Sequence, residues 1–380
     1  MTGGLPLGRI AGVPVSVHWS VLVIFGLIAG GLAAGRFPAT YPGASGWAYA
    51  AAGVAAALVF LAGLLAHEVS HAVVAQRNGL PVEGITLWLF GGVARLQGEA
   101  PDPGAEVRIA GVGPLVSLLL SVAFGAAWAV ATLSGAEGLG VAVLMWLAAI
   151  NLALAAFNAI PAAPLDGGRL LRAALWKARG DRTWAAVVAA RAGRVLGLVL
   201  IGLGLVQFFL GAGFGGLWLA LIGWFLIGAA QAEERQAQLG DALAGVRVAD
   251  VMSPDPTAAP GHVTVADFID SHLFRHRFST FPVLEGDRPV GLVTLGRVKA
   301  VPPGDRPAVR LGEIACPLDE VPVAAPEEEL TDLLPRLGGC ADGRALVVDR
   351  AGDLVGIVSP SDVARAVERS RLRGRAVTRV

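Results

Sequence analysis

The sequence predicts a polytopic α-helical membrane protein of about six transmembrane helices, followed by a cytosolic α/β region. Hydrophobic residues make up 54% of the chain and charged residues only 16%. Apolar runs of the length that crosses a bilayer core, about 20 residues, recur through the first part of the chain. After Ala232 polar and charged residues become frequent. The first part is therefore expected in the membrane and the second part in water.

Six apolar runs are long enough to be membrane spans: residues 15–34, 48–75, 108–132, 139–160, 186–210 and 214–231. Lys and Arg lie in the connections after the second and fourth runs, whereas the segments 38–47, 134–138 and 211–215 of the other connections contain none. Because positively charged loops stay in the cytosol, we expect the exits of the second and fourth runs and both chain termini there.

The amino-terminal segment 1–14 carries one charge and has no features of a cleavable signal peptide. We therefore expect a multi-pass protein of the plasma membrane that stays in the lipid bilayer. The net charge is zero, so nothing in the overall charge points to a nucleic-acid partner.

The second run contains the motif His67-Glu68-Val69-Ser70-His71. Histidines four residues apart lie on one face of a helix and can bind one metal ion, with the glutamate beside them to activate water. Such a motif can also occur by chance in the core helix of a soluble protein. The apolar surroundings argue against that alternative, because ionisable groups at membrane depth cost a few kcal/mol each and need a functional reason.

A catalytic zinc ion usually has three protein ligands and one open position. The two histidines supply only two, so a third ligand must come from elsewhere in the chain. The fourth run ends in residues 158–168, NAIPAAPLDGG, where the prolines break the helix. The second and fourth runs cross the membrane in the same direction, which brings this segment to a depth similar to that of the histidines. Asp166 is its only acidic residue and the best candidate for the third ligand. The alternative is that Asp166 caps a helix that begins at Gly167.

The two motifs, HEVSH on one span and N-x-x-P-x-x-P-L-D-G-G at the end of another, resemble the site-2 protease family of intramembrane zinc metalloproteases. The resemblance implies that one Zn²⁺ per chain is bound by His67, His71 and Asp166. It also implies that Glu68 is the general base and that Asn158 contacts the substrate carbonyl or its oxyanion. The substrates of this family are membrane proteins, cleaved in or near a transmembrane segment during regulated intramembrane proteolysis.

Residues 88–95, WLFGGVAR, resemble the extended hairpin or membrane-dipping loop that this family places beside zinc. Gly91 and Gly92 permit close approach of the backbone, and an exposed strand edge there could bind the substrate as an added strand. A plain interfacial turn is the alternative. Residues 111–117, GVGPLVS, are interpreted as helix packing. His18 could line the active-site cavity, or it could simply lie at the membrane interface.

The water-facing region contains an internal repeat, residues 281–294 and 345–359, in which each copy reads strand, turn, strand. It resembles a tandem pair of cystathionine-β-synthase (CBS) domains. The predicted domains are a membrane protease domain, a linker helix, two CBS domains and a basic tail, at residues 1–232, 233–245, 246–304, 305–370 and 371–380.

The second repeat ends in a segment, 356–362, that matches the ribose and phosphate signature of CBS domains. The resemblance implies that Asp362 accepts hydrogen bonds from ribose hydroxyls and that Ser359 contacts phosphate of an ATP- or AMP-type adenine nucleotide. The first repeat keeps Thr294 but has Arg297 at the position of the aspartate, so we expect one working nucleotide site at most. A purely structural pair is the alternative. CBS pairs commonly dimerise, and a homodimer through these domains is expected.

Cys316 and Cys340 are the only cysteines, and both lie in the part predicted to be cytosolic. Because the cytosol is reducing, we expect them to be buried thiols and not a disulfide. The arginines of the tail are expected on a solvated helix end, or near anionic lipid.

The sequence thus predicts a zinc-dependent intramembrane endopeptidase, with access or assembly modulated by the CBS pair. Two alternatives come from other classes. A CBS-regulated transporter would also place polar residues in the membrane, but the chain lacks the matching broken spans of inverted repeats. A catalytically inactive scaffold gains no support, because every catalytic residue type is present.

Overall fold

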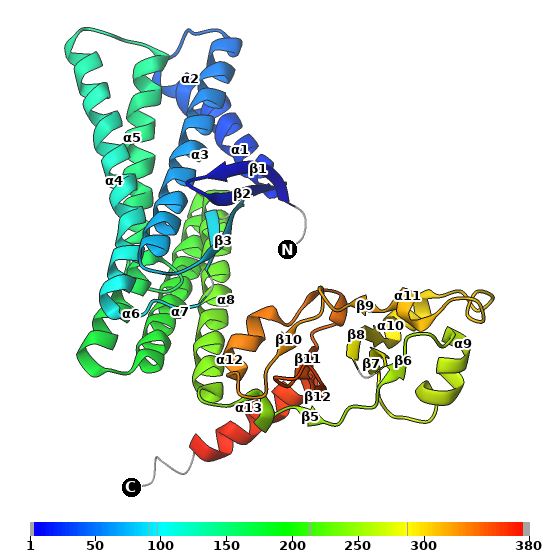
Figure 1. Ribbon diagram of the computed structural model, residues 1–380. Helices are drawn as coiled ribbons and strands as arrows, with labels where there is room; N and C mark the ends of the chain where they lie inside the picture. Colours follow the sequence, from blue (N-terminus) through cyan, green and yellow to red (C-terminus); the bar gives the residue numbers. More distant parts are fainter. Residues whose placement is uncertain (1–3, 90, 97, 213, 287, 375–380) are drawn as a thin grey trace. The chain divides into compact units, whose positions relative to one another are not determined.

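Figure 1 shows the computed structural model, which describes residues 4–374 except 90, 97, 213 and 287. Within these residues, six helices are long and apolar enough to cross a membrane. They are Ser20–Thr40, Gly46–Arg77, Pro103–Leu133, Leu139–Asn158, Arg182–Gly211 and Gly215–Leu243. The prediction of six spans followed by an α/β region is confirmed.

The chain divides into two compact units, Met1–Ala237 and Gln238–Val380. The helices of the first unit are α1 (Ser20–Gly31), α2 (Phe37–Thr40), α3 (Gly46–Arg77), α4 (Pro103–Leu133), α5 (Leu139–Asn158), α6 (Asp166–Arg179), α7 (Arg182–Gln207) and α8 (Phe214–Leu243). One π-helical segment, Leu32–Arg36, joins α1 to α2, and a second, Phe208–Ala212, follows α7. The residues expected to begin a separate linker helix at 233 belong to α8, which continues to Leu243.

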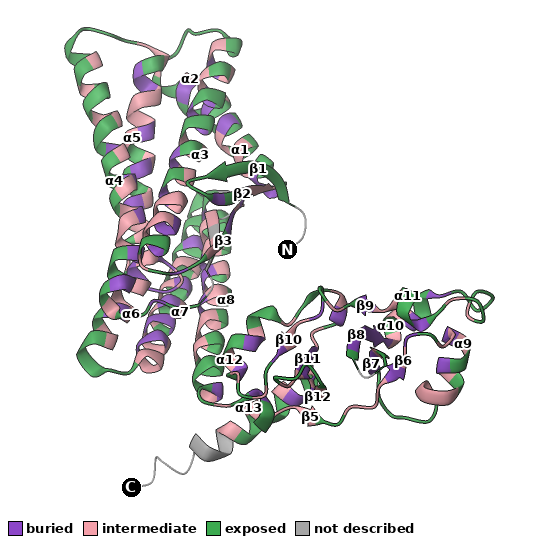
Figure 2. Cartoon of the chain, viewed as in Figure 1, coloured by how far each residue is buried: buried purple, intermediate pink, exposed green. Residues whose placement is uncertain are grey.

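Much of each membrane helix is exposed in the structure (Figure 2), and large apolar residues are among the exposed ones. On α4, for example, Leu118, Leu119 and Val122 are 42%, 59% and 61% exposed. Side chains of this kind would be unfavourable in water and are favourable against lipid. Their exposure agrees with a bilayer around these helices.

Polar side chains cap the start of some of the long helices. Ser45 accepts a hydrogen bond from the Ala48 amide at the start of α3. Asp102 caps α4 in the same way. Each cap satisfies one backbone N–H that lacks a partner within the helix.

Glycines bring α7 and α8 into close contact. A Cβ atom at Gly197 would lie 2.6 Å from the Gly223 carbonyl oxygen, and one at Gly216 would lie 2.4 Å from the Gly204 oxygen. Any larger residue would push the two backbones apart, which is why small residues favour such helix contacts in membranes.

A four-stranded sheet lies beside the helices of the first unit, with strands β1 (Gly4–Ile10), β2 (Val13–His18), β3 (Val82–Trp88) and β4 (Gly91–Leu96) in this order. The hairpins β1–β2 and β3–β4 are antiparallel, and β2 is parallel to β3. The second hairpin occupies the segment where an extended hairpin or loop is expected. The first hairpin was not predicted. It ends at His18, whose Nδ1 lies 2.8 Å from the Ser20 hydroxyl at the start of α1.

The second unit contains two four-stranded sheets, one for each repeat. The strands of the first sheet, in order, are β6 (Ala259–Pro260), β7 (Thr280–Glu285), β8 (Arg288–Thr294) and β9 (Cys316–Pro317). Those of the second are β10 (Val323–Ala324), β11 (Ala345–Val348), β12 (Leu354–Val358) and β5 (Ser253–Pro254). The repeats therefore exchange short strands. β5 precedes β6–β8 along the chain but completes the second sheet, and β9 is followed by β10–β12 but completes the first sheet.

Short helices accompany these sheets: α9 (Val265–Phe268), α10 (Leu295–Ala300), α11 (Leu311–Ile314), α12 (Leu330–Leu333) and α13 (Pro360–Gly374). Each sheet has its own apolar core, built around Phe268 and Phe281 in the first repeat and around Leu330 and Val347 in the second.

Cys316 and Cys340 form a disulfide in the structure, with their Cα atoms 5.7 Å apart. The expectation of two separate thiols is therefore wrong. It rested on the redox compartment alone, whereas the fold brings β9 next to the turn that contains Cys340, within the Cα separation of ordinary disulfides. Most of the predicted basic tail, residues 375–380, lies outside the described residues.

Candidate active site

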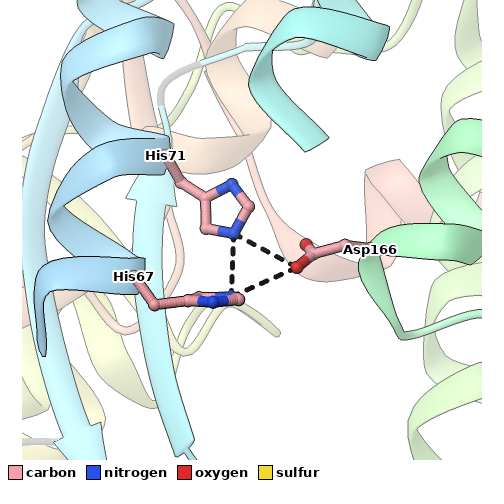
Figure 3. A group of neighbouring side chains, drawn as sticks. All are labelled: His67, His71 and Asp166. Carbon is pink, nitrogen blue, oxygen red and sulfur yellow. Dashed lines mark hydrogen bonds and ion pairs between the residues drawn. The ribbon is translucent and has the colours of Figure 1, made fainter. Parts of the chain in front are cut away.

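Helix α3 places His67 and His71 side by side. They are four residues apart and are 2% and 7% exposed, with their Nε2 atoms 3.2 Å from each other. Both rings leave the same face of the helix, as the spacing predicts. Figure 3 shows the two side chains pointing toward Asp166, which comes from α6.

The Asp166 carboxylate reaches both histidines. Its Oδ2 lies 3.2 Å from Nε2 of His67 and 3.2 Å from Nε2 of His71. Although burial would raise the pKa of Asp166, the hydrogen bonds to the two histidines outweigh it and hold the pKa below its usual range. The carboxylate is therefore charged at neutral pH and available as a metal ligand.

A tight turn after the fourth span places Asp166 in the site. The chain leaves α5 at Asn158 and α6 begins at Asp166, with Leu165 as the capping residue and no side-chain cap. The alternative in which Asp166 caps the helix is thus not what the structure shows. A Cβ atom at Gly167 or Gly168 would lie 2.3 Å from backbone atoms of this turn. The glycine pair is required for α6 to start this close to the loop.

The three donor atoms fit a zinc ion. They form a triangle with sides of 3.2 Å. Ligands at 2.0–2.2 Å from zinc in tetrahedral geometry lie about 3.3 Å apart. A Cβ atom at Gly113 of α4 would lie 2.1 Å from His71 Nε2 and 2.6 Å from His67 Nε2. Glycine at this position therefore leaves free the space next to both nitrogens.

Helix α4 also orients the two imidazole rings. His71 Nδ1 lies 2.6 Å from the Ile109 carbonyl oxygen, and His67 Nδ1 lies 2.9 Å from the Ser117 hydroxyl. A carbonyl only accepts, so Nδ1 of His71 carries the proton, and its Nε2 lone pair faces the site. This is the usual outer-shell arrangement of metal-binding histidines. The interpretation of residues 111–117 as helix packing alone is therefore wrong for Gly113 and Ser117.

Glu68 lies beside the histidines and against β4. The backbone of Gly92 forms a hydrogen bond with the Glu68 carboxylate. A Cβ atom at Gly92 would lie 2.2 Å from Glu68 Cγ, so no other residue fits there without displacing the glutamate. Gly91 begins the strand with a φ of 136°, a conformation that favours glycine. Both glycines thus hold the hairpin next to the candidate base.

Comparisons with known proteins identify the family of this chain. The model of peptidase family M50 matches residues 55–137 and 134–201, and the CBS-domain model matches 248–302 and 311–369. The Mycobacterium tuberculosis H37Rv protein "Putative zinc metalloprotease Rip3" is 48% identical over 375 residues, which cover 98% of this chain and 95% of that protein. The chain belongs to peptidase family M50.

Two matches from Methanocaldococcus jannaschii, one to a sequence and one to a solved structure, extend the comparison of this M50 chain. Zinc metalloprotease MJ0392 is 27% identical, over 97% of both chains. The solved structure of a site-2 protease is 27% identical, covers 61% of this chain and 95% of its own, and has a TM-score of 0.42. The protein is an intramembrane zinc metalloendopeptidase of the site-2 protease type with a CBS pair. The family resemblance of the two motifs and of the repeat is confirmed.

Asn158, the predicted substrate contact of the M50 domain, is the last residue of α5. Its side-chain amide donates to the Leu154 carbonyl oxygen, 3.1 Å away, within its own helix. It lies eight residues before Asp166. Its contact with the substrate stays a prediction.

The CBS pair of this M50 protein brings Ser359 and Asp362 together. The Asp362 carboxylate is 2% exposed and accepts hydrogen bonds from the amide and hydroxyl of Ser359, at 2.8 and 2.5 Å. It also accepts from Ser253 at 3.2 Å and pairs with Arg365. Thr294, which occupies the position of Ser359 in the first repeat, is buried at the start of α10. Asp362 is thus a fixed acceptor, whereas the first repeat has no carboxylate at this position.

Proposed function

We propose that this M50 enzyme hydrolyses a peptide bond within or near the transmembrane segment of a membrane-protein substrate, and that it does so with one Zn²⁺ held by His67, His71 and Asp166. The observation that carries the proposal is the triangle of three ligand atoms, 3.2 Å apart, formed by an apolar span and the turn after another. Regulated intramembrane proteolysis is the process that such an enzyme serves.

The chemistry divides between the ion and the chain. Bound zinc supplies Lewis-acid polarisation of the substrate carbonyl and acidification of water. Glu68 takes the proton of the attacking water and returns it to the leaving amine, as a general base and then a general acid. The backbone of Gly92 fixes the Glu68 carboxylate for this transfer.

The sheet offers a way to hold the substrate. β4 pairs with β3 on one side and lies at the end of the sheet order, so its other edge can accept a strand. A helical peptide hides its carbonyls in internal hydrogen bonds, and an unwound segment added to β4 would regain backbone partners. Because Gly92 contacts Glu68, such a strand would present its peptide bonds next to the base. Asn158 would then stabilise the developing oxyanion.

Replacement of Glu68 by Gln tests this assignment. We expect cleavage of a membrane-anchored reporter protein in proteoliposomes to fall by about 10²–10⁴-fold, with the zinc content unchanged. Glu137→Gln, at an exposed position in the connection between α4 and α5, is the matched control and should cleave normally. Full cleavage by Glu68→Gln would exclude the mechanism.

We also propose that one adenine nucleotide of the ATP or AMP type binds at the CBS pair and modulates access or assembly. The fixed carboxylate of Asp362 supports a contact with the ribose, and Ser359 would contact the phosphate. Thr294 would add a contact with the nucleotide from the first repeat. Arg297 donates to the Ile314 carbonyl at 2.8 Å and offers no acceptor, which supports a single site. Calorimetric titration of the full-length protein with ATP and AMP should show binding that Asp362→Asn removes. No heat with either nucleotide would refute the site.

The remaining proposals concern assembly and orientation. A homodimer through the CBS domains should give twice the chain mass, about 78 kDa of protein against the 38.9 kDa of one chain, in light scattering of the detergent complex. We also propose that the protein lies in the plasma membrane with both termini in the cytosol. A reporter enzyme that works only in the cytosol should then be active when fused to either terminus. A monomer, or an external terminus, would contradict the respective proposal.

A further inference from the structure

Helix α4 contacts the candidate ligands with one face. The Ile109 carbonyl and the Ser117 hydroxyl bind the two histidine rings, and Gly113 lies between them against both Nε2 atoms. Glu106 lies three residues before Ile109 on the same face of α4. It is 1% exposed, and the chemistry described above gives it no part.

Glu106 binds the helix that carries the third ligand. Its Oε1 accepts from Nε of Arg169 at 2.9 Å and from a terminal nitrogen of Arg172 at 2.5 Å. Arg169 lies three residues after Asp166 and Arg172 six, so both belong to the first two turns of α6. One buried carboxylate therefore connects α4 to the start of α6 by directional bonds.

The same cluster extends to α8. The other terminal nitrogen of Arg172 lies 3.5 Å from a carboxylate oxygen of Glu233. Although burial would lower the pKa of Arg172, the carboxylates of Glu106 and Glu233 raise it above its ordinary value. Two carboxylates and two guanidinium groups balance in charge, and a buried ion pair of this kind holds its partners in place because the loss of one leaves an uncompensated charge.

We propose that Glu106 is a positioning residue for zinc binding: through Arg169 and Arg172 it sets the start of α6, so that the Asp166 carboxylate meets the two histidines. Helix α4 then orients all three ligands, His67 through a hydroxyl, His71 through a carbonyl and Asp166 through this ion-pair cluster. The inference rests on the zinc site proposed above.

A double-mutant cycle tests it with the full-length protein in detergent. Apparent zinc affinity is measured by competition with chelators of graded strength for wild type, Glu106→Gln, Asp166→Ala and the double variant. We expect Glu106→Gln to weaken zinc binding by about 10–100-fold, the usual effect of losing an outer-shell partner. In the Asp166→Ala background the same change should cause no further loss, because residues that act through one another are not additive.

Glu234→Gln is the matched control. It removes the carboxylate from an ion pair with Arg194, 3.1 Å long, between α8 and α7, and should leave zinc affinity unchanged. If Glu106→Gln fails to fold, Arg169→Lys keeps the charge but loses the planar guanidinium contact, and it enters the same cycle.

The outcomes separate the two proposals. Wild-type affinity in the Glu106 variant, or an equal loss in both backgrounds, would overturn the positioning role and leave the zinc site intact. Absence of zinc from the wild type, or no effect of Asp166→Ala, would overturn the zinc site itself and with it this inference.

Discussion

A single methyl group on Gly113 should remove zinc binding. In Gly113→Ala the new Cβ would lie 2.1 Å from His71 Nε2 and 2.6 Å from His67 Nε2. Nonbonded heavy atoms separate by about 3.5 Å, so the His71 ring would have to retreat by about 1.4 Å. The methyl also lies at about the distance from His71 Nε2 at which zinc would bind it, 2.0–2.1 Å, and so occupies the space next to the ligand nitrogens. We therefore expect a zinc content close to zero.

The control is Gly111→Ala, two residues away on the same helix. There the nearest atom to a new Cβ is Leu170 Cδ2 at 3.9 Å, an ordinary contact. Both variants replace a helical glycine by alanine, which favours the helix by about 0.5–1 kcal/mol. This gain partly offsets the steric cost at Gly113, so Gly113→Ala should still fold while it loses its metal.

Metal analysis of the purified proteins, together with thermal unfolding followed by circular dichroism, checks the pair. We expect about one zinc per chain in wild type and Gly111→Ala, and almost none in Gly113→Ala. Stoichiometric zinc in Gly113→Ala would refute the placement of the metal. Loss of zinc from both variants would show that helix α4 tolerates no alanine there, and that the steric argument is wrong.

Three further results are expected. Gly92→Ala should retain zinc but lose about 10²-fold in kcat, because it displaces Glu68 by an ångström or more; wild-type turnover would contradict this contact. Asn158→Ala should lower kcat by about 10²–10³-fold, as loss of an oxyanion donor does, and an effect on KM alone would argue against that role. Reduction of the Cys316–Cys340 disulfide should lower the free energy of unfolding by about 2–4 kcal/mol, and mass spectrometry that finds only free thiols without reductant would contradict the bond.

The spans and the two polar motifs of the candidate site could be predicted because their information is local. Twenty apolar residues suffice to predict a membrane helix, and the spacing of His67 and His71 places both rings on one face. The turn around Asp166 is likewise encoded by neighbouring prolines and glycines. The roles of Glu106 and Ser117 could not be predicted, because their partners lie on other helices and a single polar residue does not reveal what it faces.

Pairings between distant strands were also beyond the sequence. β2 is parallel to β3, which begins 64 residues after β2 ends, and no periodicity connects the two. The disulfide is a similar case, because the spacing of two cysteines does not show whether the fold brings them together.

The strand exchange in the CBS pair means that neither repeat is a complete folding unit. A chain cut between β8 and β9 would separate the first sheet from its last strand, β9, and the second sheet from its last strand, β5. The loss or gain of a single repeat would therefore break two sheets at once, and the pair is expected to unfold in one cooperative transition.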